Sequence, residues 1–149
     1  MQDAKFVEAE NKGRKPIENL IKNKCVAYEF QSTKSQVDLF VTGHTKTAAI
    51  EVKDRERYNA DEVEKFGGMY IKENKFNSLM DTTISGYTPY FAVVFKDYIY
   101  LWDLTLINLE FHEEYLKVTE VEDNGWSYQS VSNLHIKDAI VKYETKRYL

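Results

Sequence analysis

Two acidic residues and a lysine interrupt segments that otherwise have the composition of buried strands. Asp38 opens the apolar run VDLFVT, and Glu51 and Lys53 stand inside the run TAAIEVKD. Because side chains alternate across a strand, Glu51 and Lys53 share one face, while Ile50 and Val52 point to the other. Isolated buried charges are too costly to keep, so the Glu51–Lys53 face must meet water, a ligand or a partner charge.

A short polar turn, GHTK at 43–46, joins these two runs and predicts a hairpin. Asp38 and Glu51 can then approach each other across the pair, with the register left open. Two carboxylates that meet raise each other's pKa unless a cation joins them, and Mg²⁺ needs only a few protein oxygens. A neighbouring lysine could position an attacking water and stabilise charge on a phosphate. The set indicates phosphodiester hydrolysis.

These residues resemble the signature of the PD-(D/E)XK nuclease superfamily, which includes restriction endonucleases, archaeal Holliday-junction resolvases and phage exonucleases. The resemblance implies that Asp38 and Glu51 ligate Mg²⁺, for which Mn²⁺ can substitute, with the backbone carbonyl of Val52 as a further ligand. It implies that Lys53 serves the water and the phosphate. Glu18, in the first predicted helix, occupies the kind of position from which several of these families add a glutamate.

One position departs from the pattern of the superfamily. Val37 stands where the proline that gives the signature its name would be. The superfamily core runs helix, three strands, helix, strand, and residues 16–96 are predicted to follow that order. The resemblance therefore covers a little over half of the chain and explains nothing after residue 104.

The predicted elements follow from periodicity and from turn residues. Pro16 suits the first turn of a helix, PIENLIKNK. One long helix is expected from the capping residue Asn59 to about Met80, with Gly67-Gly68 inside it. The expected strands are KCVAYEF (24–30), VDLFVT (37–42), TAAIEVKD (47–54), YFAVVF after Pro89, and YIYLWDL after a KD turn.

The C-terminal segment is harder to assign. LKVTEVEDNGWSYQSV has the pattern of a hairpin with its bend at 123–125, and DAIVKYE that of a short closing helix. We therefore predict an α/β (α+β) fold with a restriction-endonuclease-like core and a mixed central sheet. Residues 1–149 form a single nuclease-like domain, with the core at about 16–104 and a C-terminal β-rich appendix at about 105–149.

The charge distribution favours the first half as the side that binds a polyanion. Residues 1–80 carry 14 basic and 13 acidic residues, whereas residues 81–149 carry 6 and 11. Basic side chains near the signature would contact phosphates of a nucleic acid, most simply DNA, without reading its sequence. The candidates are Lys46, Arg55, Arg57, Lys72 and Lys75.

Other features limit the setting of the protein. A single cysteine, Cys25, excludes an internal disulfide, and no Cys or His cluster has the spacing of zinc ligands. No apolar run reaches the length of a membrane span, so we expect a cytoplasmic protein without a membrane partner. A homodimer would supply two sites for cutting both strands of a duplex.

Several alternatives stay open at this point. Asp38, Glu51 and Lys53 could form an exposed ion-pair ladder across a hairpin, and Glu18 could be an ordinary solvent-facing helix residue. The rival function is a catalytically inactive nuclease-like fold that acts as a nucleic-acid or protein interaction module. A nuclease acting on RNA fits the same signature.

Overall fold

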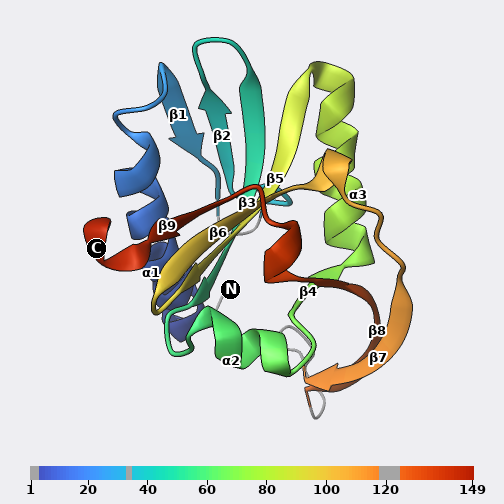
Figure 1. The fold of residues 1–149 in the computed structure, drawn as a ribbon. Helices are drawn as coiled ribbons and strands as arrows, with labels where there is room; N and C mark the ends of the chain where they lie inside the picture. The colour runs from blue at the N-terminus through green and yellow to red at the C-terminus, as the bar shows by residue number, and fades with distance from the viewer. Residues whose placement is uncertain (1–3, 33–34, 118–124) are drawn as a thin grey trace.

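A six-stranded mixed sheet forms the centre of the computed structural model, which describes residues 4–32, 35–117 and 125–149. In the sheet β3 and β5 run parallel, and every other neighbouring pair is antiparallel (Figure 1). The α/β fold with a mixed central sheet is thus confirmed. The strands lie in the order β1 (Ala27–Phe30), β2 (Leu39–Thr42), β3 (Thr47–Arg55), β5 (Tyr87–Phe95), β6 (Tyr98–Asp103) and β9 (Val141–Glu144).

Helix α1 (Ala4–Ile21) covers one face of this sheet. Its buried side chains Ile17 and Leu20 pack against the face that carries Ile50 and Val52 of β3. Pro16 lies deep inside the helix, so its placement in a first turn is wrong. An interior proline removes a helix hydrogen bond at a cost of about 3 kcal/mol. Burial of the apolar face that follows it outweighs this local penalty.

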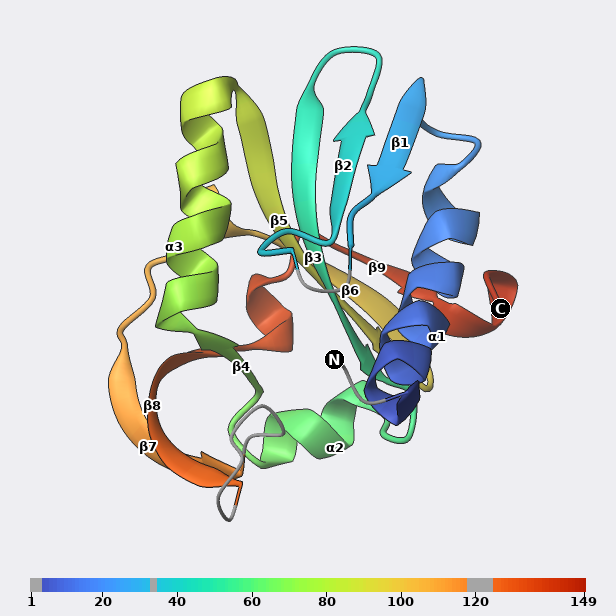
Figure 2. The same ribbon diagram turned by 180° about the vertical axis from the view of Figure 1, so that it is seen from behind.

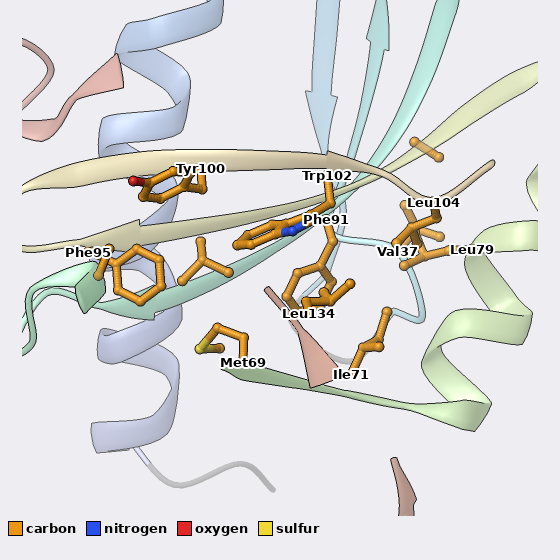
Figure 3. Close-up of a cluster of buried hydrophobic side chains, with 13 residues drawn as sticks. Val37, Met69, Ile71, Leu79, Phe91, Phe95, Tyr100, Trp102, Leu104 and Leu134 are labelled. Carbon is orange, nitrogen blue, oxygen red and sulfur yellow. The ribbon is translucent and has the colours of Figure 1, made fainter. Parts of the chain in front are cut away.

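The opposite face of the sheet is covered by a second, antiparallel sheet and by helix α3 (Glu73–Asp81), which lie on the same side of the molecule (Figures 1 and 2). The order in the second sheet is β4 (Met69–Lys72), β8 (Trp126–Leu134), β7 (His112–Lys117). Side chains of β4 and β8 meet Phe91 and Trp102 of the central sheet in one apolar cluster (Figure 3). The C-terminal segment thus completes the core.

The long helix expected from Asn59 to Met80 is wrong. The chain forms the short helix α2 (Ala60–Lys65), then β4, then α3. Gly67 and Gly68 separate α2 from β4 with φ of 100° and 88°, values that only glycine adopts readily. The side-chain amide of Asn133 in β8 also donates a hydrogen bond to the Gly67 carbonyl at 2.6 Å. Pairing with β8, about sixty residues further along the chain, overrides the helical periodicity of this segment.

Substitution of Gly68 by alanine is expected to destabilise the protein by on the order of 3 kcal/mol. A Cβ at this position would lie 2.5 Å from the Leu134 carbonyl oxygen, and φ is positive. Gly86→Ala is the matched control, because Gly86 has the same φ of 88° but nothing within 4 Å of its added Cβ. That variant should lose only about 1–2 kcal/mol. Urea denaturation measures both, and equal losses would contradict the close-approach argument.

Two expectations for the C-terminal segment have different outcomes. A hairpin is confirmed as β7 (His112–Lys117) and β8, but only residues 116 and 117 of the expected first arm lie in β7, and residues 118–124, which hold the rest of that arm and most of the bend, lie outside the described residues. The closing helix is wrong, because residues 141–144 form β9 on the edge of β6. Val141 pairs with Leu101 and Tyr143 with Ile99. The segment therefore adds a strand to the free edge of β6 and does not form a helix. The described residues also form four 3₁₀ turns, at Thr82–Ser85, Leu104–Leu106, Ile136–Asp138 and Thr145–Arg147.

Candidate active site

The hairpin register brings the two predicted acids face to face. Leu39 pairs with Ile50, so the same antiparallel register continued by one residue places Asp38 opposite Glu51. Asp38 itself lies in the bend before β2, one residue short of the strand. The two carboxyl groups lie close enough for each to shift the pKa of the other, and the residues are only 6% and 2% exposed. The register that the sequence left open is therefore the one that joins the acids.

Asp38 is held from two directions. The Val52 backbone N–H donates to Asp38 Oδ2 at 2.8 Å, and Arg14 Nη2 of α1 donates to Oδ1 at 3.1 Å. Arg14 Nη1 donates in turn to the Gln31 carbonyl at 3.0 Å. Both carboxylate oxygens of Asp38 thus have fixed donors, which set its orientation before any ligand arrives.

The residue before Asp38 anchors the bend in the core. Val37 is 7% exposed and lies beside Leu79 of α3 and Leu104 (Figure 3). Figure 2 shows the segment that enters β2 crossing between α1 and α3. An apolar side chain in a fixed pocket can therefore place Asp38 here without the backbone restriction that a proline would impose.

Glu51 meets a cation that was expected elsewhere. Lys75 Nζ of α3 lies 2.6 Å from Glu51 Oε2 and also donates to the Gln36 carbonyl at 2.9 Å. Although Lys75 is close, the geometry at Glu51 Oε2 is not that of a hydrogen bond, and this buried oxygen has no hydrogen-bond partner among the described residues. The prediction that Lys75 is a DNA contact did not anticipate this position. No local sequence signal marks it, because it depends on the break between β4 and α3.

Burial controls the protonation of the acid pair. Loss of hydration raises the pKa of Glu51 to about 8, helped by the hydrogen bond to Asp38 and by the charge of Asp38, against the opposing charges of Lys53 and Lys75. Burial also acts to raise the pKa of Asp38, but hydrogen bonds with Glu51, the Val52 N–H and Arg14 outweigh it and lower that pKa. Near neutral pH the pair therefore holds one proton on Glu51, which faces an ionised Asp38.

Lys53 lies on the same face of β3 as Glu51, two residues further along the strand, and is half-buried. The positive charge of Lys53 lowers the pKa of Glu51, against the larger effect of burial. Within residues 4–32, 35–117 and 125–149 we find no hydrogen-bond or ion-pair partner for its ammonium group. The group is thus near the acids and not engaged by them.

Glu18 does not join the pair. Its carboxylate accepts a hydrogen bond from Tyr28 Oη at 3.1 Å and lies 3.5 Å from Lys15 Nζ. Together with Arg14 and Phe30, Lys15 and Glu18 line an open depression of about 220 Å³. In the part of the chain that the structure describes, no three His, Cys, Asp or Glu residues form a group that could hold a metal ion. A metal would have to rely on two carboxylates here, and the role of Glu18 stays a prediction.

The remaining basic candidates do not form one strip. Lys46 is exposed in the turn before β3, whereas Arg55 and Arg57 are exposed at and beyond its far end. At about 3.3 Å per residue, Lys46 and Arg55 lie roughly 30 Å apart along the strand. Lys72 is half-buried at the end of β4. Any phosphate contacts would therefore come from separate places around the acid pair.

Comparison with known proteins yields a match in structure alone. No protein-family model matches the chain, and no curated protein matches it. The structure is similar to that of Hjc, a Holliday junction resolvase from the archaeal hyperthermophile Archaeoglobus fulgidus, solved at 1.6 Å resolution. The TM-score is 0.55 at 13% sequence identity, over 93% of this chain and 86% of that chain.

This likeness concerns the fold. It confirms that the chain has a fold similar to that of the resolvase, an α/β fold with a mixed central sheet, together with a second small antiparallel sheet. At 13% identity it does not carry the activity of the resolvase over to this chain. In addition, no helix among the described residues is long and apolar enough to span a membrane.

Proposed function

We propose that the protein is a metal-dependent nuclease that hydrolyses DNA phosphodiester bonds at the Asp38–Glu51 pair. One observation supports this most directly. Two carboxyl groups, Asp38 from the bend before β2 and Glu51 from β3, meet in a buried position, and Lys53 follows Glu51 by two residues, in a fold similar to that of a Holliday junction resolvase. Two structural ion pairs, Asp38 with Arg14 and Glu51 with Lys75, would not require the two acids to lie together, whereas this arrangement buries them side by side at a cost in stability.

The donor atoms fit a hard divalent cation. Carboxylate oxygens are the preferred ligands of Mg²⁺ and Mn²⁺, and Glu51 Oε2 is a buried oxygen without a hydrogen-bond partner among the described residues. Asp38 and Glu51 would hold the ion, and the carbonyl of Val52 is the further ligand that we infer. When bound, such an ion lowers the pKa of a coordinated water and neutralises charge on the phosphate. With two protein carboxylates, most of the coordination shell would be water.

The side chains of the protein supply the rest of the reaction. Arg14 is a positioning residue, since it fixes the Asp38 carboxylate. Lys53 would orient the attacking water and stabilise negative charge on the phosphate oxygens. The water oxygen forms a bond to phosphorus while one phosphorus–oxygen ester bond breaks, which leaves a phosphate monoester and a free hydroxyl. Arg55, Arg57 and Lys72 would hold the backbone of the DNA on either side.

The test is cleavage of labelled DNA in Mg²⁺ or Mn²⁺ by the wild type and by Glu51→Gln. The substrates are a linear duplex, a single strand, a supercoiled circle and a four-way junction. We expect metal-dependent cutting of at least one of them, and a loss of about a hundredfold or more in the variant. The matched control is Glu113→Gln, an exposed glutamate on β7 outside the site.

Two results would contradict the proposal. Full activity of Glu51→Gln would show that the pair is not the catalytic centre. Absence of cutting on every DNA, with equal DNA binding by the wild type and the variant, would favour the inactive interaction module. Cleavage of RNA alone, still dependent on Glu51, would keep the mechanism and change the substrate.

A further inference from the structure

Each acid of the candidate site has its own internal cation. Arg14 lies 3.1 Å from Asp38 Oδ1, and Lys75 lies 2.6 Å from Glu51 Oε2. Both cations come from helices that flank the sheet, α1 and α3. The protein itself therefore already places a positive charge beside each of the two carboxyl groups that would hold a divalent ion.

The two cations differ in how firmly they are held. The Arg14 side chain is 12% exposed, and its guanidinium bridges Asp38 and the Gln31 carbonyl in a planar fork. The Lys75 side chain is 22% exposed, sits on a flexible stem, and contacts Glu51 without hydrogen-bond geometry. Lys75 is thus the cation that can leave. Among the described residues, its ammonium group has one other partner, the Gln36 carbonyl.

We propose that the Lys75 ammonium occupies the place at Glu51 that the divalent ion must take, so that metal binding displaces it and DNA then captures it. The proposal rests on the function proposed above. The displaced ammonium stays within the length of one side chain of the metal, where like charges repel. A DNA phosphate near the metal relieves that repulsion by pairing with the ammonium. Lys75 then couples metal binding to DNA binding.

This arrangement has two thermodynamic consequences. Without DNA, the metal must compete with an internal cation, so its affinity is reduced. With DNA, the released ammonium gains a partner, so the metal binds more tightly, and by reciprocity the metal strengthens DNA binding by the same factor. Direct contact between the metal ion and a DNA phosphate would also couple metal binding to DNA binding. The part of the coupling that is due to Lys75 is therefore the difference between the wild type and a Lys75 variant.

The experiment is a calorimetric titration with Ca²⁺, a hard cation that takes oxygen ligands as Mg²⁺ does, without DNA. It is run at pH 9.5, well above the pKa of about 8 of Glu51, so that loss of the Lys75 charge has little effect on the ionisation of Glu51. The proteins are the wild type, Glu51→Gln, Lys75→Met, the charge-conserving Lys75→Arg, and the control Lys137→Met, which removes an exposed lysine of the 3₁₀ turn Ile136–Asp138. We expect Lys75→Met to bind Ca²⁺ about tenfold more tightly than the wild type. Lys75→Arg and Lys137→Met should stay within about twofold of it.

A second titration repeats the measurement with a saturating duplex DNA. The wild type should gain more affinity for Ca²⁺ from DNA than Lys75→Met does, again by about tenfold. Lys75→Gln replaces Lys75→Met in both titrations if thermal unfolding shows that the methionine variant does not fold. Neither titration uses cleavage as its readout.

The outcomes separate this inference from the proposed function. If wild-type Ca²⁺ binding is lost in Glu51→Gln but Lys75→Met binds no more tightly than the wild type, the metal site stands and the inference fails. Equal coupling to DNA in the wild type and in Lys75→Met would overturn it as well. If no protein of the set binds Ca²⁺, the inference and the proposed metal site both fail.

Discussion

Glu51→Gln is expected to stabilise the metal-free protein at alkaline pH, by on the order of 4 kcal/mol at pH 9. Burial holds the pKa of Glu51 at about 8 against an ordinary value of 4.5. An ionised Glu51 therefore destabilises the folded state, while glutamine carries no charge. The glutamine amide can still donate to Asp38 where the protonated carboxyl group does. Active sites often lower the stability of the folded protein in this way, and the Glu51→Gln variant would regain the lost stability.

The sign of the pH dependence follows from the proton count. Between pH 4.5 and about 8 the folded protein holds a proton on Glu51 that the unfolded chain has released. The free energy of unfolding of the wild type should therefore fall as pH rises through this window, by about 1.4 kcal/mol per pH unit. Asp38 acts in the opposite sense, because its pKa is lowered from 3.8, and its contribution is lost only as pH falls below that value.

Urea denaturation in a chelator at pH 5, 7 and 9 measures this difference. The curves for the wild type and Glu51→Gln should converge at pH 5 and separate at pH 9. Glu113→Gln should follow the wild type throughout, because Glu113 is exposed on β7. Parallel curves for the wild type and Glu51→Gln would mean that Glu51 is not protonated in the folded state.

Lys53→Met is expected to reduce DNA cleavage about a hundredfold or more, while metal affinity and DNA affinity change only several-fold. The loss should appear in kcat and not in KM, because a group that acts on the water and on developing charge stabilises the transition state alone. The methylene stem of lysine is largely retained in methionine, so packing at this half-buried position should survive. Lys137→Met serves again as the control.

The assay of Lys53→Met requires attention to pH. The charge of Lys53 lowers the pKa of Glu51, so its removal raises that pKa further. An activity loss at pH 7 that disappears at pH 9 would show that Lys53 acts only through the protonation of Glu51. A loss that persists at pH 9 is the expected result and assigns Lys53 to the reaction itself. Undiminished cleavage at both pH values would remove Lys53 from the mechanism.

The sequence by itself determined the central part of the fold. The alternation in TAAIEVKD and the polar turn at 43–46 predicted the β2–β3 hairpin, and YFAVVF with its return strand predicted β5 and β6. These elements depend on contacts between residues close in the chain, where periodicity and turn chemistry are strong signals. The approach of Asp38 to the Glu-Val-Lys strand could therefore also be predicted from the sequence, although Asp38 lies in the bend before β2 and not in the strand itself.

The tertiary structure decided what those residues meet. The break of the expected helix at Gly67-Gly68 follows from pairing between β4 and β8, and the placement of residues 141–144 follows from the open edge of β6. The break also determines where α3 begins, and hence that Lys75 reaches Glu51. Separately, the packing of α1 beside β1 brings Glu18 to Tyr28 and not to the acid pair. Such contacts join segments tens of residues apart. Their free energy comes from burial and pairing across the core, which no local pattern in the chain records.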